Sequence, residues 1–208
     1  MTVLAFLDYA SVFVFALTGA LVASRAQLDL VGFVFMASLT AVGGGTLRDI
    51  ILNRDTVFWV AQPSYIGVAC LAALLVFFTA HLLESRYRTI VWLDACALAI
   101  AVPAGVAVAV AMGQPPSIVV IMGIITGCFG GLMRDVVCNE VPLVLKQGEL
   151  YVTCALLGGV AASLAHYFGL PQPLALSICA GSAFALRAGS IAFGWHLPVY
   201  RAFPPQQK

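Results

Sequence analysis

Two short motifs place glycine, arginine and aspartate inside strongly apolar stretches of the chain. They read GGGTLRDIILN at residues 43–53 and GGLMRDVVCN at residues 130–139. Glycine permits close backbone approach or local unwinding of a helix, and carbonyl oxygens freed by unwinding can replace the hydration shell of a cation. A charged side chain at the centre of a bilayer costs about 2.5–3.5 kcal/mol, so these charges must be paired or hydrated. The motifs therefore favour electrostatic chemistry over catalysis.

The two motifs belong to a duplication that covers most of the chain. Arg48 and Arg134 are 86 positions apart, and the same offset joins further identical residues without a gap. Those pairs are Asp8 with Asp94, Gly19 with Gly105, Thr40 with Thr126, Asp49 with Asp135, Asn53 with Asn139, and Tyr65 with Tyr151. A register of this length indicates an internal repeat.

The glycine clusters admit two interpretations. A single glycine in a membrane helix commonly serves close packing, but three in succession exceed what packing requires, so we expect a kink or break in each helix. Carbonyls released at a break are tolerated only against protein or a water-filled cavity, and serine and threonine hydroxyls can line the same path. The candidates for the break and the path are Ser38, Thr40, Gly43, Gly44, Gly45, Thr126, Gly130 and Gly131.

The charged residues also leave alternatives open. The arginines either lock the fold around each bent helix or form an electrostatic wall of a conduction path. Because neighbours in sequence point about 100° apart on a helix, we expect each arginine to find a partner on another segment. Asp8 and Asp94 either benefit from the helix dipole, pair with an arginine or attract cations at the two mouths. The asparagines either share the network or end the helix. The full set is Asp8, Arg48, Asp49, Asn53, Asp94, Arg134, Asp135 and Asn139.

Membrane-spanning helices must position these residues. Of the 208 residues, 62% are hydrophobic and 9% charged, and the mean hydropathy is +1.03, whereas soluble domains carry about 25% charged residues. About 20 apolar residues cross a bilayer as a helix. On this basis the sequence predicts seven spans, at residues 3–23, 30–52, 65–83, 90–112, 118–138, 150–168 and 174–193. Aromatic residues such as Tyr65 and Tyr151 fall near span ends, where an aromatic belt is expected.

Three spans in each repeat make the second copy enter the membrane from the opposite side. This is an inverted-topology repeat, with a pseudo-two-fold axis in the membrane plane. We therefore predict an all-α membrane protein with one domain over residues 1–208. It contains repeats at residues 1–86 and 87–172, followed by a seventh helix and tail at residues 173–208.

Loop cations predict the orientation of the chain. They are more numerous on the side opposite the N-terminus, which places the N-terminus outside and the C-terminus in the cytoplasm. The cations on that side are Arg25, Arg86, Arg88, Lys146, Arg201 and Lys208.

Several classes of function find no support in the sequence. It contains no H-E-x-x-H motif, no phosphate loop and no Ser–His–Asp set at plausible depth, so we expect no enzyme, no cofactor and no fixed metal site. The six cysteines lie singly in apolar runs, as buried thiols do. A net charge of +1 without a basic stripe argues against a nucleic-acid partner. The first apolar run lacks a positive n-region and is interrupted by Asp8, so we expect it to remain as a helix.

The duplicated three-span halves, the G-G-x-x-R-D-x-x-x-N signature in each and the seventh span resemble the prokaryotic trimeric intracellular cation (TRIC) channel family. The sequence RAGSIAFGWHLP at residues 187–198 is similar to the family's C-terminal pattern. The resemblance implies a homotrimer in the inner membrane, with a pore in each subunit lined by the first, second, fourth and fifth spans. It also implies potassium as the permeant ion near the glycine breaks, with sodium as a second. The second cluster is preceded by Phe129, which becomes a candidate plug or hydrophobic constriction.

Domains of this kind are also labelled glycine transporters, so a secondary transporter of glycine or another small solute is the alternative. Inverted repeats with broken helices suit alternating access equally well. A carrier of a zwitterion needs groups for both carboxylate and ammonium at the midplane, whereas here the charges cluster near span ends. We therefore predict a passive monovalent-cation channel, with a non-conducting scaffold as a third class.

Overall fold

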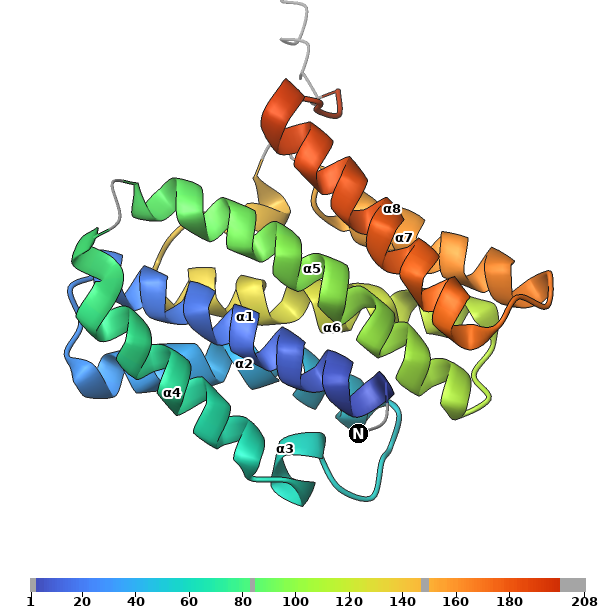
Figure 1. Cartoon of the computed structure of the whole chain (residues 1–208), viewed down its shortest axis with the longest axis horizontal. Helices are drawn as coiled ribbons and strands as arrows, with labels where there is room; N and C mark the ends of the chain where they lie inside the picture. Colours follow the sequence, from blue (N-terminus) through green and yellow to red (C-terminus); the bar gives the residue numbers. More distant parts are fainter. Residues whose placement is uncertain (1–2, 83–84, 147–149, 199–208) are drawn as a thin grey trace, which may run out of the picture.

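The computed structural model of the protein describes residues 3–82, 85–146 and 150–198. Within them the chain forms eight α-helices and two short 3₁₀ helices (Figure 1). Their bounds are α1 (Val3–Arg25), α2 (Leu30–Ile51), α3 (Phe58–Ala61), α4 (Ser64–Thr79), η1 (Ala80–Leu82), α5 (Arg86–Ala111), α6 (Pro116–Val137), η2 (Leu143–Leu145), α7 (Val152–Tyr167) and α8 (Gln172–Phe193). Each predicted span overlaps one long helix, whereas the four-residue α3 was not predicted.

Polar and conformationally special residues set the helix ends. The Asp29 carboxylate caps α2 by accepting the N–H of Gly32 at 2.8 Å, and the Ser85 hydroxyl caps α5 in the same way. Pro116 begins α6, where its missing N–H costs no hydrogen bond. Gly194 ends α8 with a φ of 70°, a left-handed conformation that glycine adopts without strain.

Within the described part of the chain, six helices are long and apolar enough to cross a membrane: α1, α2, α4 with η1, α5, α6 and α8. Helix α7 has 16 residues, so at about 1.5 Å per residue it is shorter than the roughly 30 Å hydrocarbon core. Large apolar side chains point outward from the bundle, including Val31, Phe35 and Phe78. Exposed apolar surface of this extent is what lipid contact requires, and the chain is therefore an all-helical membrane protein.

Four helices form the centre of the bundle. Helix α1 packs on α2 and α5, and α6 packs on the same two, so the four contact one another in a ring. Helices α3 and α4 lie on one side of this ring, and α7 and α8 lie together on the other (Figure 1). One buried apolar cluster draws mainly on α1, α2 and α4, and a second draws mainly on α5, α6 and α7. Each sequence repeat thus supplies most of the residues of its own hydrophobic core.

The two repeats have helices at matching positions. Helices α2 and α6 begin and end 86 residues apart, and α1 and α5 end 86 residues apart. Helices α4 and α7 each contain 16 residues. The predicted division of the chain at residues 86/87 and 172/173 thus falls close to helix starts.

Tyr65 and Tyr151 do not belong to an interfacial belt. Their exposed fractions are 4% and 1%, because each packs against the bundle interior. The Tyr65 ring stacks on Tyr9 at a centroid distance of 4.1 Å, and the Arg187 guanidinium of α8 lies 5.1 Å from the Tyr151 ring centroid. The aromatic belt prediction is wrong for these two residues.

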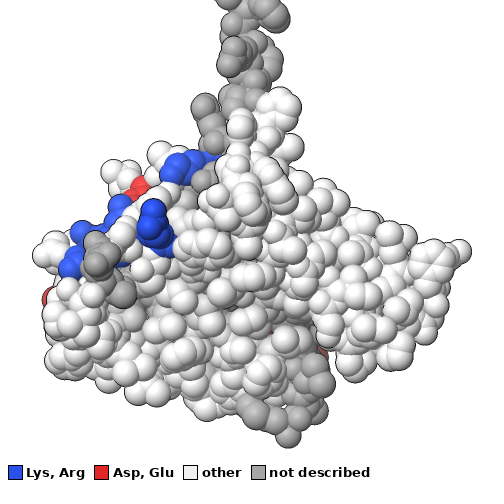
Figure 2. All heavy atoms as spheres, turned by 45° about the horizontal axis from the view of Figure 1, so that its top comes forward, with Lys and Arg blue, Asp and Glu red and all other residues white. Residues whose placement is uncertain are grey.

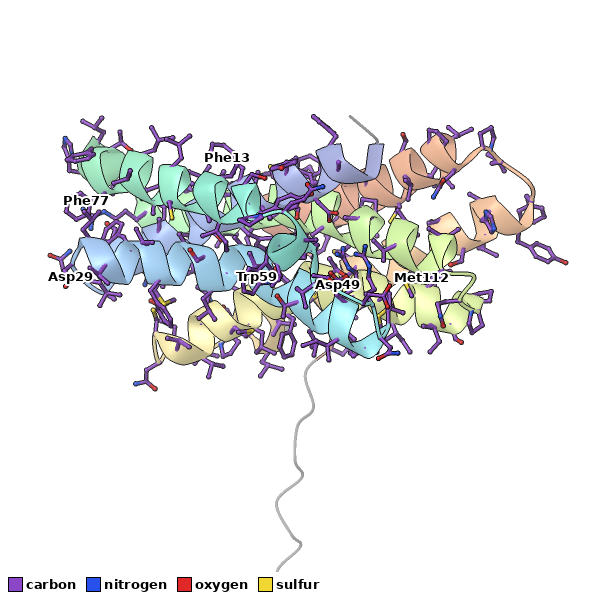
Figure 3. All side chains as sticks on the ribbon, turned by 90° about the horizontal axis from the view of Figure 1, so that it is seen from below. Phe13, Asp29, Asp49, Trp59, Phe77 and Met112 are labelled. Carbon is purple, nitrogen blue, oxygen red and sulfur yellow. The ribbon has the colours of Figure 1, made fainter. Side chains whose placement is uncertain are left out.

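Several Lys and Arg side chains lie together on one face of the molecule. Figure 2 shows Lys and Arg atoms together at one edge of the visible face, which is otherwise almost uncharged. Figure 3 shows the bundle from below, with Asp29 and Phe77 at one end and Met112 towards the other. Two of the predicted cytoplasmic cations, Arg201 and Lys208, lie outside the described residues.

Candidate functional site

The first ion-pair network joins α1, α2 and the segment that leads into α3. Arg48 is fully buried; its Nη1 donates to Asp8 Oδ1 at 3.3 Å and its Nε donates to Asp49 Oδ1 at 2.8 Å. Asp49 Oδ1 also accepts from Arg54 Nη1 at 3.2 Å, and Oδ2 accepts the backbone N–H of Phe58 at 2.8 Å. The Arg48 guanidinium lies 5.5 Å from the centroid of the Phe58 ring. Both oxygens of the buried Asp49 are therefore satisfied, as a buried charge requires.

The second network repeats the first between α5, α6 and the start of η2. Arg134 Nη1 donates to Asp94 Oδ1 at 2.8 Å, and its Nε donates to Asp135 Oδ1 at 2.7 Å. Asp135 Oδ2 accepts the backbone N–H of Leu143 at 2.9 Å. Arg134 and Asp94 have no exposed surface, and Asp135 is 3% exposed. Removing one partner of such a buried pair costs about 3–5 kcal/mol, so each network ties two helices and a loop together.

Each arginine thus has two carboxylate partners, one expected and one not. The sequence predicts a partner on another segment, and Asp8 and Asp94 occupy that role. The contact with the following aspartate, Asp49 or Asp135, was not predicted, because adjacent helical residues point about 100° apart. The arginine stem is long enough for Nε to reach the neighbour while Nη1 reaches across to the next helix.

The two networks differ in their access to solvent. Asp8 borders a cavity of about 190 Å³, which also touches Arg54, Phe58 and Tyr65. Its side chain is 11% exposed, whereas that of Asp94 is 0% exposed. The carboxylate that faces a cavity is therefore the cross-helix partner Asp8 in the first network, whereas in the second network Asp94 is enclosed and Asp135 borders a cavity instead.

The second network encloses a small polar space beside α6. A Cβ placed on Gly131 would lie 3.5–3.7 Å from Tyr151 Oη, Asp94 Oδ1 and Arg134 Nη2. At the equivalent Gly45 the Phe58 ring fills this space, 2.6 Å from the same point. Among the described residues, Asp94 Oδ2, Arg134 Nη2 and Tyr151 Oη of this group are buried without a hydrogen-bond partner.

The asparagines of the two motifs end their helices. Asn53 and Asn139 have φ angles of 51° and 54°, in the left-handed region that asparagine tolerates. The next N–H in each case closes the helix, from Arg54 to the Asp49 carbonyl at 3.0 Å and from residue 140 to the carbonyl of residue 135 at 2.9 Å. Both asparagine side chains are exposed. Of the two roles left open by the sequence, the structure shows helix termination.

Neither glycine cluster interrupts its helix. Helices α2 and α6 continue as α-helix through residues 43–45 and 130–131. A Cβ on Gly44 would lie 2.3 Å from the carbonyl oxygen of Thr126, and a Cβ on Gly130 would lie 2.3 Å from that of Thr40. The expected helix break with freed carbonyls is therefore wrong, because the missing side chains are used for direct backbone contact between α2 and α6. A kink of these continuous helices at the glycines stays a prediction.

The threonine hydroxyls lie at a second contact of the same kind. A Cβ on Gly19 of α1 would lie 2.6 Å from Thr40 Oγ1, and one on Gly105 of α5 would lie 2.5 Å from Thr126 Oγ1. Each hydroxyl donates to the carbonyl four residues earlier in its own helix, at 2.7 and 2.6 Å. The geometry gives Thr40 and Thr126 a packing role at the crossing of three helices.

The remaining sequence candidates lie around this crossing. A Cβ on Gly43 would lie 3.0 Å from Met133 Sδ, so Gly43 also faces α6. Ser38 and Phe129 are half-buried, on α2 and α6 respectively. The path-lining role of Ser38, Thr40 and Thr126 stays a prediction, as does the role of Phe129 as a plug or hydrophobic constriction.

A charged cluster that the sequence did not single out lies at the far end of α1. Arg25 pairs with Glu140 at 3.3 Å, and its guanidinium lies 5.2 Å from the centroid of the Tyr87 ring. The Lys146 ammonium lies 4.9 Å from the same centroid. These residues and Asp135 line a cavity of about 300 Å³. Glu140 stands 86 positions after Arg54, so the two repeats carry opposite charges at this equivalent position. A search for residues that are identical in the two repeats does not find this pair.

Comparison with known proteins decides the family. A family model described as "Glycine transporter" matches the chain twice, at residues 5–81 and 91–167. The structure of the TRIC trimeric intracellular cation channel orthologue from Rhodobacter sphaeroides is 42% identical, with a TM-score of 0.90 over 93% of this chain and 100% of that one.

The chain belongs to the TRIC family. A second solved structure, of a prokaryotic TRIC channel in 0.5 M KCl, is 27% identical with a TM-score of 0.86, over 94% of this chain and 98% of that one. The UPF0126 inner membrane protein YadS of Escherichia coli is 37% identical over 197 residues, which is 93% of each chain. YvgT of Bacillus subtilis is 32% identical over 92% of this chain and 94% of its own length. The TRIC resemblance predicted from the motifs is confirmed.

The two matches of the family model begin and end 86 residues apart, the offset found in the sequence. They contain both ion-pair networks and both glycine contacts, and they leave out α8. The features that repeat in this TRIC protein are thus the ones that the family model describes twice.

Proposed function

We propose that this TRIC protein is a passive channel for monovalent cations in the inner membrane, with potassium as the main permeant ion and sodium as a second. The observation that carries the proposal is its likeness to the TRIC cation channel of Rhodobacter sphaeroides at 42% identity over 93% of the chain. The inner-membrane location is supported by six apolar helices and by the relative YadS, which is described as an inner membrane protein.

The proposed passage runs inside each subunit, bounded by α1, α2, α5 and α6. These four helices contact one another in a ring, and they carry the arginines and aspartates of both networks. The cavity beside Asp8 lies near the start of α1, and the cavity beside Arg25 lies near its end. These two hollows, at opposite ends of one helix, are the candidate mouths.

Conduction requires a route around the glycine contacts or a separation of α2 and α6. The Gly44 backbone and the Thr126 carbonyl are in direct contact, which leaves no room for an ion between them. Because both helices are continuous, we do not propose ion coordination by freed carbonyls. Solvating groups on the route are instead side chains and water, with Asp8 attracting cations at its mouth.

The arginines are proposed as locks rather than as walls of the passage. Arg48 and Arg134 are fully buried and each contacts two carboxylates. Neither offers a free positive charge to a passing ion. Their role is to hold α1 to α2 and α5 to α6, with the loops that follow α2 and α6 fixed by Asp49 and Asp135.

We propose seven membrane crossings in two inverted three-helix repeats plus α8. Helix α7 matches α4 in length at 16 residues, and α4 with η1 is long and apolar enough to cross a membrane. The loop cations Arg25, Arg86 and Lys146 lie at one end, so this end faces the cytoplasm, together with the C-terminus. A homotrimer is proposed because the relatives of known structure are described as trimeric.

A glycine carrier is the second candidate, and the description of the family model favours it. Binding glycine would need a cation for its carboxylate and an anion for its ammonium group. Both buried arginines already hold two carboxylates each, so binding would have to displace one of them.

Flux into liposomes separates the candidates. Purified protein is reconstituted in vesicles, and potassium, sodium and labelled glycine are followed in parallel. The channel proposal expects cation flux that grows linearly with the gradient and no glycine accumulation. Saturable glycine uptake without cation current would establish the carrier instead.

A further inference from the structure

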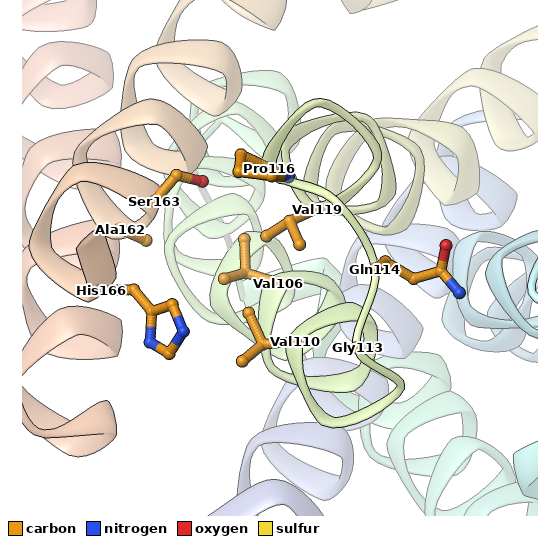
Figure 4. Close-up of a pocket in the computed structure, with 9 residues that line it drawn as sticks. All are labelled: Val106, Val110, Gly113, Gln114, Pro116, Val119, Ala162, Ser163 and His166. Carbon is orange, nitrogen blue, oxygen red and sulfur yellow. The ribbon is translucent and has the colours of Figure 1, made fainter. Parts of the chain in front are cut away.

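A cavity of about 300 Å³ opens between α5, α6 and α7, away from the central ring (Figure 4). Its apolar wall is formed by Val106 and Val110 of α5 and Val119 of α6. In Figure 4 the Ser163 and His166 side chains of α7 face these valines from the opposite side. No Asp, Glu, Lys or Arg is among the residues that line it.

The first repeat fills the equivalent space with its own side chains. Phe33 and Phe77 stand 86 positions before Val119 and Ser163. Their rings meet edge to face with centroids 5.0 Å apart, which joins α2 to α4. The second repeat therefore has two smaller side chains where the first has two aromatic rings. It also has His166 where the first repeat has alanine.

We propose that this cavity binds a small uncharged aromatic alcohol of about two rings. In the first repeat, the Phe33 and Phe77 rings occupy the equivalent space, which shows that two aromatic rings can pack there. A cavity of about 150 Å³ can hold benzene, and ligand pockets start at about 300 Å³, so two rings fit. The valines cover the rings. The Ser163 hydroxyl donates to the Gly159 carbonyl at 2.9 Å and can still accept the proton of one ligand hydroxyl group, and the His166 imidazole offers that group a second hydrogen-bond partner. The absence of charged residues from its lining disfavours a zwitterion or a metal ion.

The chain contains three histidines, which gives the binding test internal controls. The probe is 2-naphthol, titrated into full-length protein labelled with ¹³C-histidine in lipid nanodiscs. His81 lies in η1 and His196 follows α8, so neither borders the cavity. We expect the ring signals of His166 to shift and saturate, while those of His81 and His196 stay in place.

The matched variant V119F/S163F restores the side chains of the first repeat. It should weaken the saturable His166 response at least tenfold, with unchanged His81 and His196 signals showing that the fold is retained. Val119→Phe alone serves if the double variant does not fold. The proposal is overturned if His166 does not respond, if all three histidines shift in parallel without saturation, or if the filled variant responds like the natural protein. Because the readout involves no ion flow, its outcome is independent of the proposed channel.

Discussion

Replacing Asp94 by asparagine should destabilise the protein far more than the equivalent change at Asp8. The Asp94–Arg134 contact is 2.8 Å long between side chains with no exposed surface. Breaking a buried pair costs about 3–5 kcal/mol, and because Arg134 keeps its contact with Asp135, we expect about 3 kcal/mol. The Asp8–Arg48 contact is 3.3 Å long and Asp8 faces a cavity, so its loss should cost about 1 kcal/mol.

Thermal unfolding of both variants in one detergent measures the difference. For a chain of this size, 1 kcal/mol corresponds to about 2–4 °C in Tm. Asp94→Asn should therefore lower Tm by about 6–12 °C and Asp8→Asn by about 2–4 °C. Asparagine keeps the shape and one acceptor oxygen, so the comparison isolates the charge. Equal shifts, or a larger one for Asp8→Asn, would refute the reasoning that burial sets the strength of each network.

Three further outcomes follow from the packing and the charge pattern. Gly44→Ala should lower the free energy of unfolding by about 2 kcal/mol or more, because its Cβ would lie 2.3 Å from backbone. Gly131→Ala, whose Cβ would have its neighbours at 3.5 Å or beyond, should cost less than about 1 kcal/mol in the same thermal unfolding experiment. Similar losses for the two variants would count against the α2–α6 contact. Asn139→Val should lower the free energy of unfolding by about 1–2 kcal/mol, because a β-branched residue is strained at a φ of 54°. Asn139→Gly should leave Tm nearly unchanged. A valine variant as stable as the natural protein would contradict the left-handed helix end. Alkaline phosphatase fused after Gly113 should be active in the periplasm and inactive when fused after Arg88, and the reverse pattern would invert the proposed topology.

The long helices could be predicted from the sequence because they follow directly from apolar composition and length. Helix α2 was predicted at residues 30–52 and is found at Leu30–Ile51, since Asp29 caps its start and Asn53 ends it. The short helix α3 could not be predicted in this way. It depends on Asp49 accepting the N–H of Phe58 across the intervening loop, which is a tertiary contact.

The duplicated residues were the strongest guide to the site. Asp8, Arg48 and Asp49 were selected because each is a charge in an apolar stretch and each recurs 86 positions later, and they meet in one network. The same logic was uninformative for the glycines, because repetition shows that they matter without showing how. Gly44 serves a backbone contact with α6, and only the position of the partner helix reveals it.

Differences between the repeats could not be found by searching for identity. Arg54 and Glu140 occupy equivalent positions with opposite charges. Arg54 pairs with the repeated Asp49, whereas Glu140 pairs with Arg25, which has Ala111 as its counterpart in the second repeat. Likewise, Phe77 packs on Phe33 in the first repeat, whereas its counterpart Ser163 borders a cavity in the second repeat. Such differences become visible only when the two halves are compared in three dimensions.

The central claim is that one subunit of this TRIC protein conducts cations passively. Its most direct test is a single-channel recording in a planar bilayer, with a potassium chloride gradient across the membrane and sodium added to one side. The account predicts discrete current steps whose reversal potential moves towards the equilibrium potential of potassium, with a smaller permeability for sodium. A protein that gives no current in the bilayer yet accumulates glycine in vesicles from the same preparation would contradict it.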